Sequence, residues 1–159
     1  MRWRRLALVL ALLPSLAACG DDEPTPDTAI SFELLDGGTA SFADYEGTPL
    51  VVNFFASWCV PCITEMPAFE RVHQEYGERV AFLGLAVNDT VEDAREIVDQ
   101  TGVTWDLGRD PQGELLRELG GIGMPTTALL DRDGDVVEAK TGELSEGELT
   151  ELIEDHFFS

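Results

Sequence analysis

The feature that most constrains the fold is a six-residue apolar run at 50–55 that passes almost directly into a Trp-Cys-x-x-Cys segment. The run reads Leu-Val-Val-Asn-Phe-Phe and shows no alternation of polar and apolar positions. Such a run is typical of a strand buried on both faces in a parallel sheet. Apolar residues then return at the spacing of one helix face: Ile63, Met66, Phe69, Val72 and Tyr76. The sequence predicts a buried strand followed by a helix, with Cys59 and Cys62 at the junction.

The rest of the chain alternates predicted strands and helices, which indicates an α/β fold with parallel core strands. Strand patterns lie at 30–35, 39–42, 80–87, near Trp105, at 126–130 and at 136–139. Helical patterns lie at 61–76, 91–100 and 115–119, and one begins at about Ser145. Asp36-Gly37-Gly38 and Asp133-Gly134 predict the turns of two hairpins. Pro67 is expected to kink its helix, and Gly102 to end the next one.

Cys59 and Cys62 are spaced for reversible disulfide chemistry. Residues one helical turn apart have Cα atoms about 5–6 Å from each other, within the range that a disulfide allows. Free backbone N–H groups and the helix dipole favour a thiolate at the helix start, so we predict that Cys59 is the nucleophile. Cys62 lies a turn further in and is expected to be more covered. We predict that it resolves the mixed disulfide by attacking the sulfur of Cys59.

Other interpretations of the cysteine pair have less support. A structural disulfide closing so short a loop would remove little unfolded-state entropy. A zinc site would need a second cysteine pair, and the two histidines, His73 and His156, lie outside any ligand spacing and are expected to be exposed. We predict no bound metal and no cofactor. Transient holding of copper(I) by the two soft thiolates remains the alternative function.

The N-terminus has the layout of a secretory signal. Three arginines precede an apolar run at 6–18, which is too short for a spanning helix of about 20 residues. Leu-Ala-Ala-Cys at 16–19 resembles a bacterial lipobox, which implies cleavage before Cys19 and its acylation. We therefore predict a signal peptide at 1–18, a flexible acidic tether at 19–29, and one domain at 30–159. An ordinary cleaved signal that leaves a free protein is the alternative.

The composition narrows the possible partners. Ten basic residues against 31 acidic ones give a net charge of −21, which excludes nucleic acid as a partner. The acidity keeps the protein soluble and favours basic partners. We expect a monomer that lies outside the cytoplasm and is attached to the membrane through lipid on Cys19.

Three motifs together resemble the thioredoxin superfamily. They are Trp-Cys-Val-Pro-Cys at 58–62 after the buried strand, Pro67 eight residues beyond Cys59, and Gly-Met-Pro-Thr at 123–126 before the next strand. The resemblance extends from about Ile30 to the C-terminus. It implies a thioredoxin-like α/β fold with a central mixed sheet flanked by helices and an N-terminal β-hairpin extension.

Two further positions resemble the TlpA/ResA branch of extracytoplasmic thiol-disulfide oxidoreductases. Asn53 stands where thioredoxin itself has a buried aspartate, and Glu-Met-Pro occupies 65–67. A peroxidase of the same fold would instead have threonine at position 56 and proline at position 52, where this chain has Ala56 and Val52. The resemblance implies substrates that are disulfides of exported proteins, for example apocytochrome c during cytochrome c maturation, and an electron donor in the membrane.

The same resemblance assigns the remaining site residues. Pro125 is expected to form a cis peptide bond and to lie beside the dithiol. Glu65 and Asp89 are both candidates for handling the proton of the resolving cysteine. Residues expected to contact the substrate are Trp58, Pro61 and Met124.

The direction of electron transfer follows from the surroundings of Cys59. Only Val60 and Pro61 separate the cysteines, so no imidazole or added positive charge assists the helix terminus. Nearby acids oppose a thiolate. We expect the pKa of Cys59 to be lowered only moderately, and the couple to donate electrons.

We predict that Cys19 carries lipid. The full-length chain, expressed in a bacterial host, should incorporate radioactive fatty acid, and Cys19→Ser should abolish the label because it removes the acylated thiol. Equal labelling of the two chains would exclude this residue as the anchor.

Overall fold

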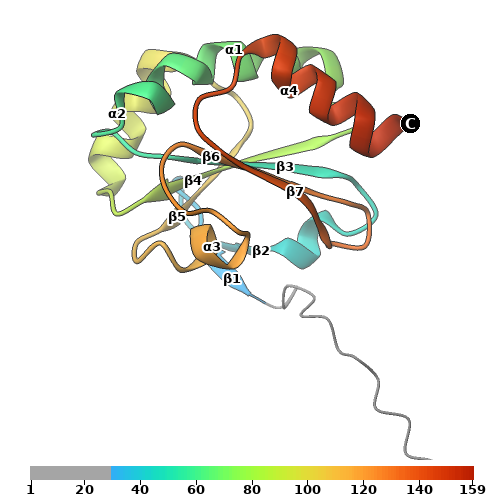
Figure 1. Cartoon of the computed structure of the whole chain (residues 1–159). Coiled ribbons are helices and arrows are strands. Elements are labelled where there is room, and N and C mark those ends of the chain that lie inside the picture. The colour runs from blue at the N-terminus through green and yellow to red at the C-terminus, as the bar shows by residue number, and fades with distance from the viewer. Residues whose placement is uncertain (1–29) are drawn as a thin grey trace, which may run out of the picture.

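The computed structural model describes residues 30–159 (Figure 1). The predicted signal peptide at 1–18, the acylation site Cys19 and the tether at 19–29 lie outside the described residues. Within 30–159, no helix is both long enough and apolar enough to cross a membrane.

A five-stranded mixed sheet forms the centre of the fold, as the family resemblance implied. Its strand order is β5-β4-β3-β6-β7. The strands are β3 (Leu50–Phe55), β4 (Ala81–Val87), β5 (Asp106–Asp110), β6 (Thr126–Leu130) and β7 (Val136–Thr141). β3, β4 and β5 run parallel, whereas β6 pairs antiparallel with both β3 and β7. The predicted parallel core therefore comprises three of the five strands.

The two faces of the sheet are covered differently (Figure 1). One face carries α1 (Val60–Tyr76), α2 (Val91–Thr101) and α4 (Glu146–Ile153), which continues as a π-helical turn at Glu154–Phe158. The other face carries the short α3 (Glu114–Glu118) and the N-terminal hairpin. Alternate residues of β3 enter the two cores: Val51 and Phe55 contribute to the first, and Leu50, Val52 and Phe54 to the second. All six residues of β3 are buried, which confirms the prediction.

The N-terminal hairpin consists of β1 (Ser31–Glu33) and β2 (Thr39–Ser41). Gly37 and Gly38 make its turn in left-handed conformations, with φ of 100° and 90°. The hairpin extends the sheet edge locally, because the Leu35 N–H donates to the Leu107 carbonyl at 2.8 Å and Leu34 bridges Gly108 of β5.

Several element boundaries differ from the prediction by one or two residues, and two of the differences have a clear physical cause. The strand expected at 39–42 ends at Ser41, because Ser41 and Asp44 form a capping box that starts a 3-10 helix at Phe42–Tyr45. The strand expected near Trp105 begins at Asp106. The Trp105 ring packs against Phe82, with 5.9 Å between ring centroids, and is 6% exposed.

Candidate functional site

Cys59 lies where the central strand gives way to the helix. A turn at 56–59 follows β3 and is closed by the Cys59 N–H, which donates to the Ala56 carbonyl at 3.1 Å. Cys59 is the N-cap of α1, and its Sγ accepts from the Cys62 N–H at 3.3 Å. The two cysteines form a disulfide with Cα atoms 5.3 Å apart. The predicted placement of the pair at the start of a helix is confirmed.

The two sulfurs differ in accessibility in the predicted order. Cys59 is 5% exposed, whereas Cys62 is 0% exposed. The residues on either side of Cys59 are open to solvent, since Trp58 is 58% and Val60 72% exposed. The surface on either side of Cys59 is therefore apolar and open, whereas Cys62 is fully covered by the protein.

A second loop reaches the same edge of the sheet. The Met124–Pro125 peptide bond is cis, as the resemblance implied. β6 begins at Thr126 opposite Phe54, near the end of β3, so the Met124–Pro125 bond lies toward the cysteine end of the sheet. Met124 packs on the core cluster that contains both cysteines. Pro61, also a predicted substrate contact, is exposed on the first turn of α1.

One apolar residue of this loop was not singled out from the sequence. Ile122 is 93% exposed and stands between Gly121 and Gly123, three residues before Pro125. A large apolar residue between two glycines can be noticed in the sequence. Whether it is exposed or belongs to the core can be decided only from the fold.

Glu65 is a buried carboxyl one turn after Cys62 on α1. It is 2% exposed. Its Oε1 accepts from the Asn53 Nδ2 at 2.9 Å, and its Oε2 accepts from the Leu144 N–H at 3.0 Å. Burial raises the pKa of Glu65 to about 7, with a smaller contribution from the negative charge of Glu143, while the two hydrogen bonds partly oppose the rise. Glu65 can therefore change protonation state near neutral pH.

On β3 this chain has Asn53 at the position where thioredoxin itself has a buried aspartate, and the buried acid next to it is Glu65. Asn53 is 2% exposed, and its Oδ1 has no hydrogen-bond partner. The Asn53 amide is not an acid, but its Nδ2 donates to the Glu65 carboxyl, which reaches it from α1. The buried ionisable group at this interface therefore belongs to α1 rather than to β3.

Asp89, the second predicted acid, contacts the turn before Cys59. Its Oδ2 accepts from the Ser57 N–H at 2.6 Å, and its Oδ1 accepts from the Ser57 hydroxyl at 2.8 Å. The Thr90 N–H also donates to Oδ1, at 3.1 Å. Glu65 and Asp89 thus have different surroundings. The contact between Ser57 and Asp89 was not predicted from the sequence.

The histidines take no part in this constellation. His73 was expected to be exposed, but its ring is largely covered by Phe82 and Trp105, at centroid distances of 5.2 and 5.8 Å. His156 lies 3.8 Å from Glu138. Within residues 30–159, no three His, Cys, Asp or Glu side chains gather in a way that could hold a metal ion.

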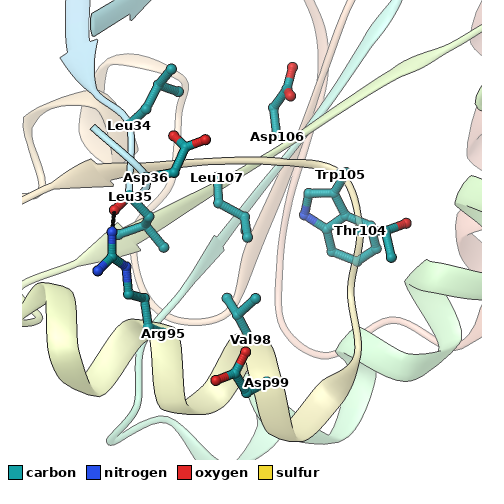
Figure 2. Close-up of a pocket in the computed structure, with 10 residues that line it drawn as sticks. All are labelled: Leu34, Leu35, Asp36, Arg95, Val98, Asp99, Thr104, Trp105, Asp106 and Leu107. Carbon is teal, nitrogen blue, oxygen red and sulfur yellow. Dashed lines mark hydrogen bonds between the residues drawn. The ribbon is translucent and has the colours of Figure 1, made fainter. Parts of the chain in front are cut away.

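A cavity of about 460 Å³ opens elsewhere, between the N-terminal hairpin, α2 and the beginning of β5 (Figure 2). Arg95 reaches across it to donate to the Leu35 carbonyl (Figure 2). None of the predicted site residues lines this cavity. The predicted site residues therefore lie away from this cavity.

The chain has relatives of known class. Residues 25–139 match the AhpC/TSA family. The thiol-disulfide oxidoreductase ResA of Bacillus thuringiensis is 30% identical over 120 residues, covering 75% of this chain and 69% of that protein. ResA of Oceanobacillus iheyensis is 29% identical over 157 residues, covering 94% and 81%.

Solved structures share the fold. A thiol:disulfide interchange protein of the thioredoxin family from Chlorobium tepidum aligns with a TM-score of 0.72 at 29% identity, covering 86% of this chain and 98% of that one. A DsbF homologue from Corynebacterium diphtheriae aligns with a TM-score of 0.72 at 28% identity, covering 79% and 83%. These likenesses confirm the thioredoxin-like fold.

The raised pKa of Glu65 predicts a pH-dependent stability. Its ordinary pKa of 4.5 rises to about 7 in the fold, so the folded state binds the proton more tightly. This contribution is full below pH 4.5 and is lost as the pH rises through 7. The difference in unfolding free energy between wild type and Glu65→Gln should therefore fall by about 3 kcal/mol between pH 4 and pH 8.

Urea denaturation of the oxidised full-length chains measures this difference. Glu75→Gln, on an exposed part of the same helix, is the matched control and should follow wild type. A wild-type curve that runs parallel to that of Glu65→Gln across this range would contradict the prediction.

Proposed function

Since the chain belongs to the AhpC/TSA family and is a thiol-disulfide oxidoreductase of thioredoxin-like fold, we propose that it reduces disulfides in exported proteins through Cys59 and Cys62. The observation that carries this proposal is the pair itself: Cys59 at the helix start, 5% exposed between the open side chains of Trp58 and Val60, and the fully buried Cys62 one turn later at disulfide distance. Such a pair suits dithiol exchange, in which both electrons come from the protein.

The proposed reaction begins with the reduced pair. The Cys59 thiolate attacks one sulfur of the substrate disulfide, whose S–S bond breaks, and the departing substrate sulfur takes a proton. Cys62 then loses its proton and attacks the Cys59 sulfur. The intramolecular disulfide forms, the mixed disulfide breaks, and the substrate leaves with two thiols. Two electrons have passed from the protein to the substrate.

Glu65 is the proposed acceptor of the Cys62 proton. It follows Cys62 by three residues on α1, so the two side chains project from the same face of the helix. Its pKa of about 7 means that it can take a proton at neutral pH and release it again. Asn53 and Leu144 hold the carboxyl in place for this step.

The proposed substrate surface lies around Cys59. Trp58, Pro61, Met124 and Pro125 would receive an extended substrate segment, with Trp58 and Pro61 providing exposed apolar contacts. We extend this surface to Ile122, because its side chain is almost fully open to solvent in the loop that leads to Pro125.

The proposed setting is the outer side of a membrane, with lipid on Cys19 as the anchor. The cysteine pair of an apocytochrome c is the first candidate substrate, which places the protein in cytochrome c maturation. After each cycle the Cys59–Cys62 disulfide must be reduced again, so the chemistry requires a dithiol donor, and we propose that this donor lies in the membrane.

The proposed direction predicts a reducing couple. Equilibration of the full-length chain with glutathione buffers should give a potential nearer about −270 mV than the roughly −120 mV of a strong oxidant. The physical reason is that no positive side chain between the cysteines stabilises the Cys59 thiolate. A potential above about −180 mV, typical of an isomerase, would mean that the protein does not act as a reductant.

Trapping identifies the substrate. Cys62→Ser should accumulate a mixed disulfide between Cys59 and exported proteins, because Cys59 can attack and nothing resolves the adduct. The adducts, separated on non-reducing gels and identified by mass spectrometry, should be absent from the matched Cys59→Ser, Cys62→Ser double variant. Adducts of equal yield in both would show that the trapped thiol is not Cys59.

A further inference from the structure

The Asp89 carboxylate is bonded to the turn that presents Cys59. Both of its oxygens accept from Ser57, one from the backbone N–H at 2.6 Å and one from the hydroxyl at 2.8 Å. Ser57 stands two residues before Cys59, within a turn that the Cys59 N–H closes on Ala56. A two-point contact fixes orientation as well as distance.

The backbone around Asp89 holds the carboxylate from its own side. Asn88, directly after β4, has a φ of 50°, a left-handed conformation that turns the chain at the end of the strand. Thr90, directly after Asp89, is the N-cap of α2, and its hydroxyl accepts from the Asp93 N–H at 3.1 Å. Asp89 is therefore placed between the end of a strand and a capped helix, and its position does not depend on Ser57 alone.

The bonding pattern argues against proton transfer by Asp89. Three donors occupy its two oxygens: the N–H and hydroxyl of Ser57, and the N–H of Thr90. Donors of this kind stabilise the ionised form. Glu65 differs from Asp89 in that it accepts from two donors, and burial raises its pKa to about 7.

A fixed carboxylate at this place has two effects on Cys59. It accepts the Ser57 N–H, which is therefore not free to donate to a Cys59 thiolate. Its charge, held on Ser57 two residues before Cys59, also opposes the formation of a negative charge on the Cys59 sulfur. Both effects favour the thiol and thus oppose the helix terminus, which favours the thiolate.

We propose that Asp89 is a positioning residue for disulfide exchange: through Ser57 it holds the turn that presents Cys59 and keeps a carboxylate bonded two residues before that thiol. This inference rests on the proposed reductase function and refines it. A less acidic nucleophile belongs to a couple that gives up electrons readily. Asp89 contributes to that direction without contacting the substrate.

Two other charged residues, Asp93 and Arg109, contact the loop around Asp89. Asp93 on α2 accepts from the Thr90 hydroxyl at 2.7 Å. Arg109 on β5 donates from Nη2 to the Asp89 carbonyl at 3.5 Å and pairs through Nη1 with Glu33 at 3.0 Å. The Arg109 guanidinium thus contacts the backbone of Asp89, and the structure pairs it with Glu33 instead of the Asp89 carboxylate.

Two measurements on reduced full-length chains test the proposal: the pH profile of Cys59 alkylation by iodoacetamide, followed by mass spectrometry, and the rate of insulin disulfide reduction at pH 7. Asp89→Asn should move the alkylation midpoint several tenths of a unit toward lower pH, because a negative charge is removed. It should also slow insulin reduction by roughly tenfold, since small misplacements of a reacting group are costly.

Variants of Ser57 separate the contact from the charge. Ser57→Ala keeps the carboxylate and the backbone N–H bond, so the midpoint should stay while insulin reduction falls severalfold. Ser57→Thr keeps the hydroxyl and should restore the wild-type rate. Asp131→Asn is the matched control, because Asp131 also accepts two backbone N–H groups, from Asp133 and Asp135, at the opposite end of β6. It should match wild type in both measurements.

The outcomes are distinguishable. A folded Asp89→Asn variant whose alkylation midpoint coincides with wild type overturns the proposal. If Asp89→Asn does not fold, equal reduction rates for Ser57→Ala and Ser57→Thr overturn it. A wild-type chain that fails to reduce insulin counts against the proposed reductase function, while the alkylation profiles still decide the role of Asp89.

Discussion

The burial of β3 is the constraint on which the rest of the structure depends. β3 lies between β4 and β6 at the centre of the sheet, with alternate side chains in two separate cores. A strand held on both faces and both edges has no freedom at its carboxyl end, so the turn at 56–59 and the start of α1 are fixed by it. Cys59 is placed by packing of apolar residues that take no part in its chemistry.

The same strand also holds the buried acid Glu65. Asn53 is the one polar residue of β3, and its amide donates to Glu65 across the interface with α1. The Leu144 N–H reaches the other carboxyl oxygen from the loop between β7 and α4. Three elements therefore meet at one buried carboxyl, whose burial costs free energy when it ionises and places its proton equilibrium in the physiological range.

Several parts of the fold could be predicted because their signals are local. The period of the apolar residues indicates β3 and α1, and Gly102, with a φ of 72°, ends α2 where the sequence predicted. Phe42 and Trp105 could not be assigned in the same way. Phe42 is taken out of the strand by a capping box formed with residues on both sides, and Trp105 is held by packing against Phe82 from another element.

The sequence by itself determined the cysteine pair, which of the two cysteines is more covered, the family, and the position of the proline loop, because these depend on spacing and local backbone geometry. It left Glu65 and Asp89 as equal candidates for one role, and only the tertiary structure separated them. The state of a carboxyl depends on desolvation and on donors brought from elsewhere in the chain. For Glu65 those donors come from Asn53 and Leu144, 12 and 79 residues away; for Asp89 the donor from a distant part of the chain is Ser57, 32 residues away.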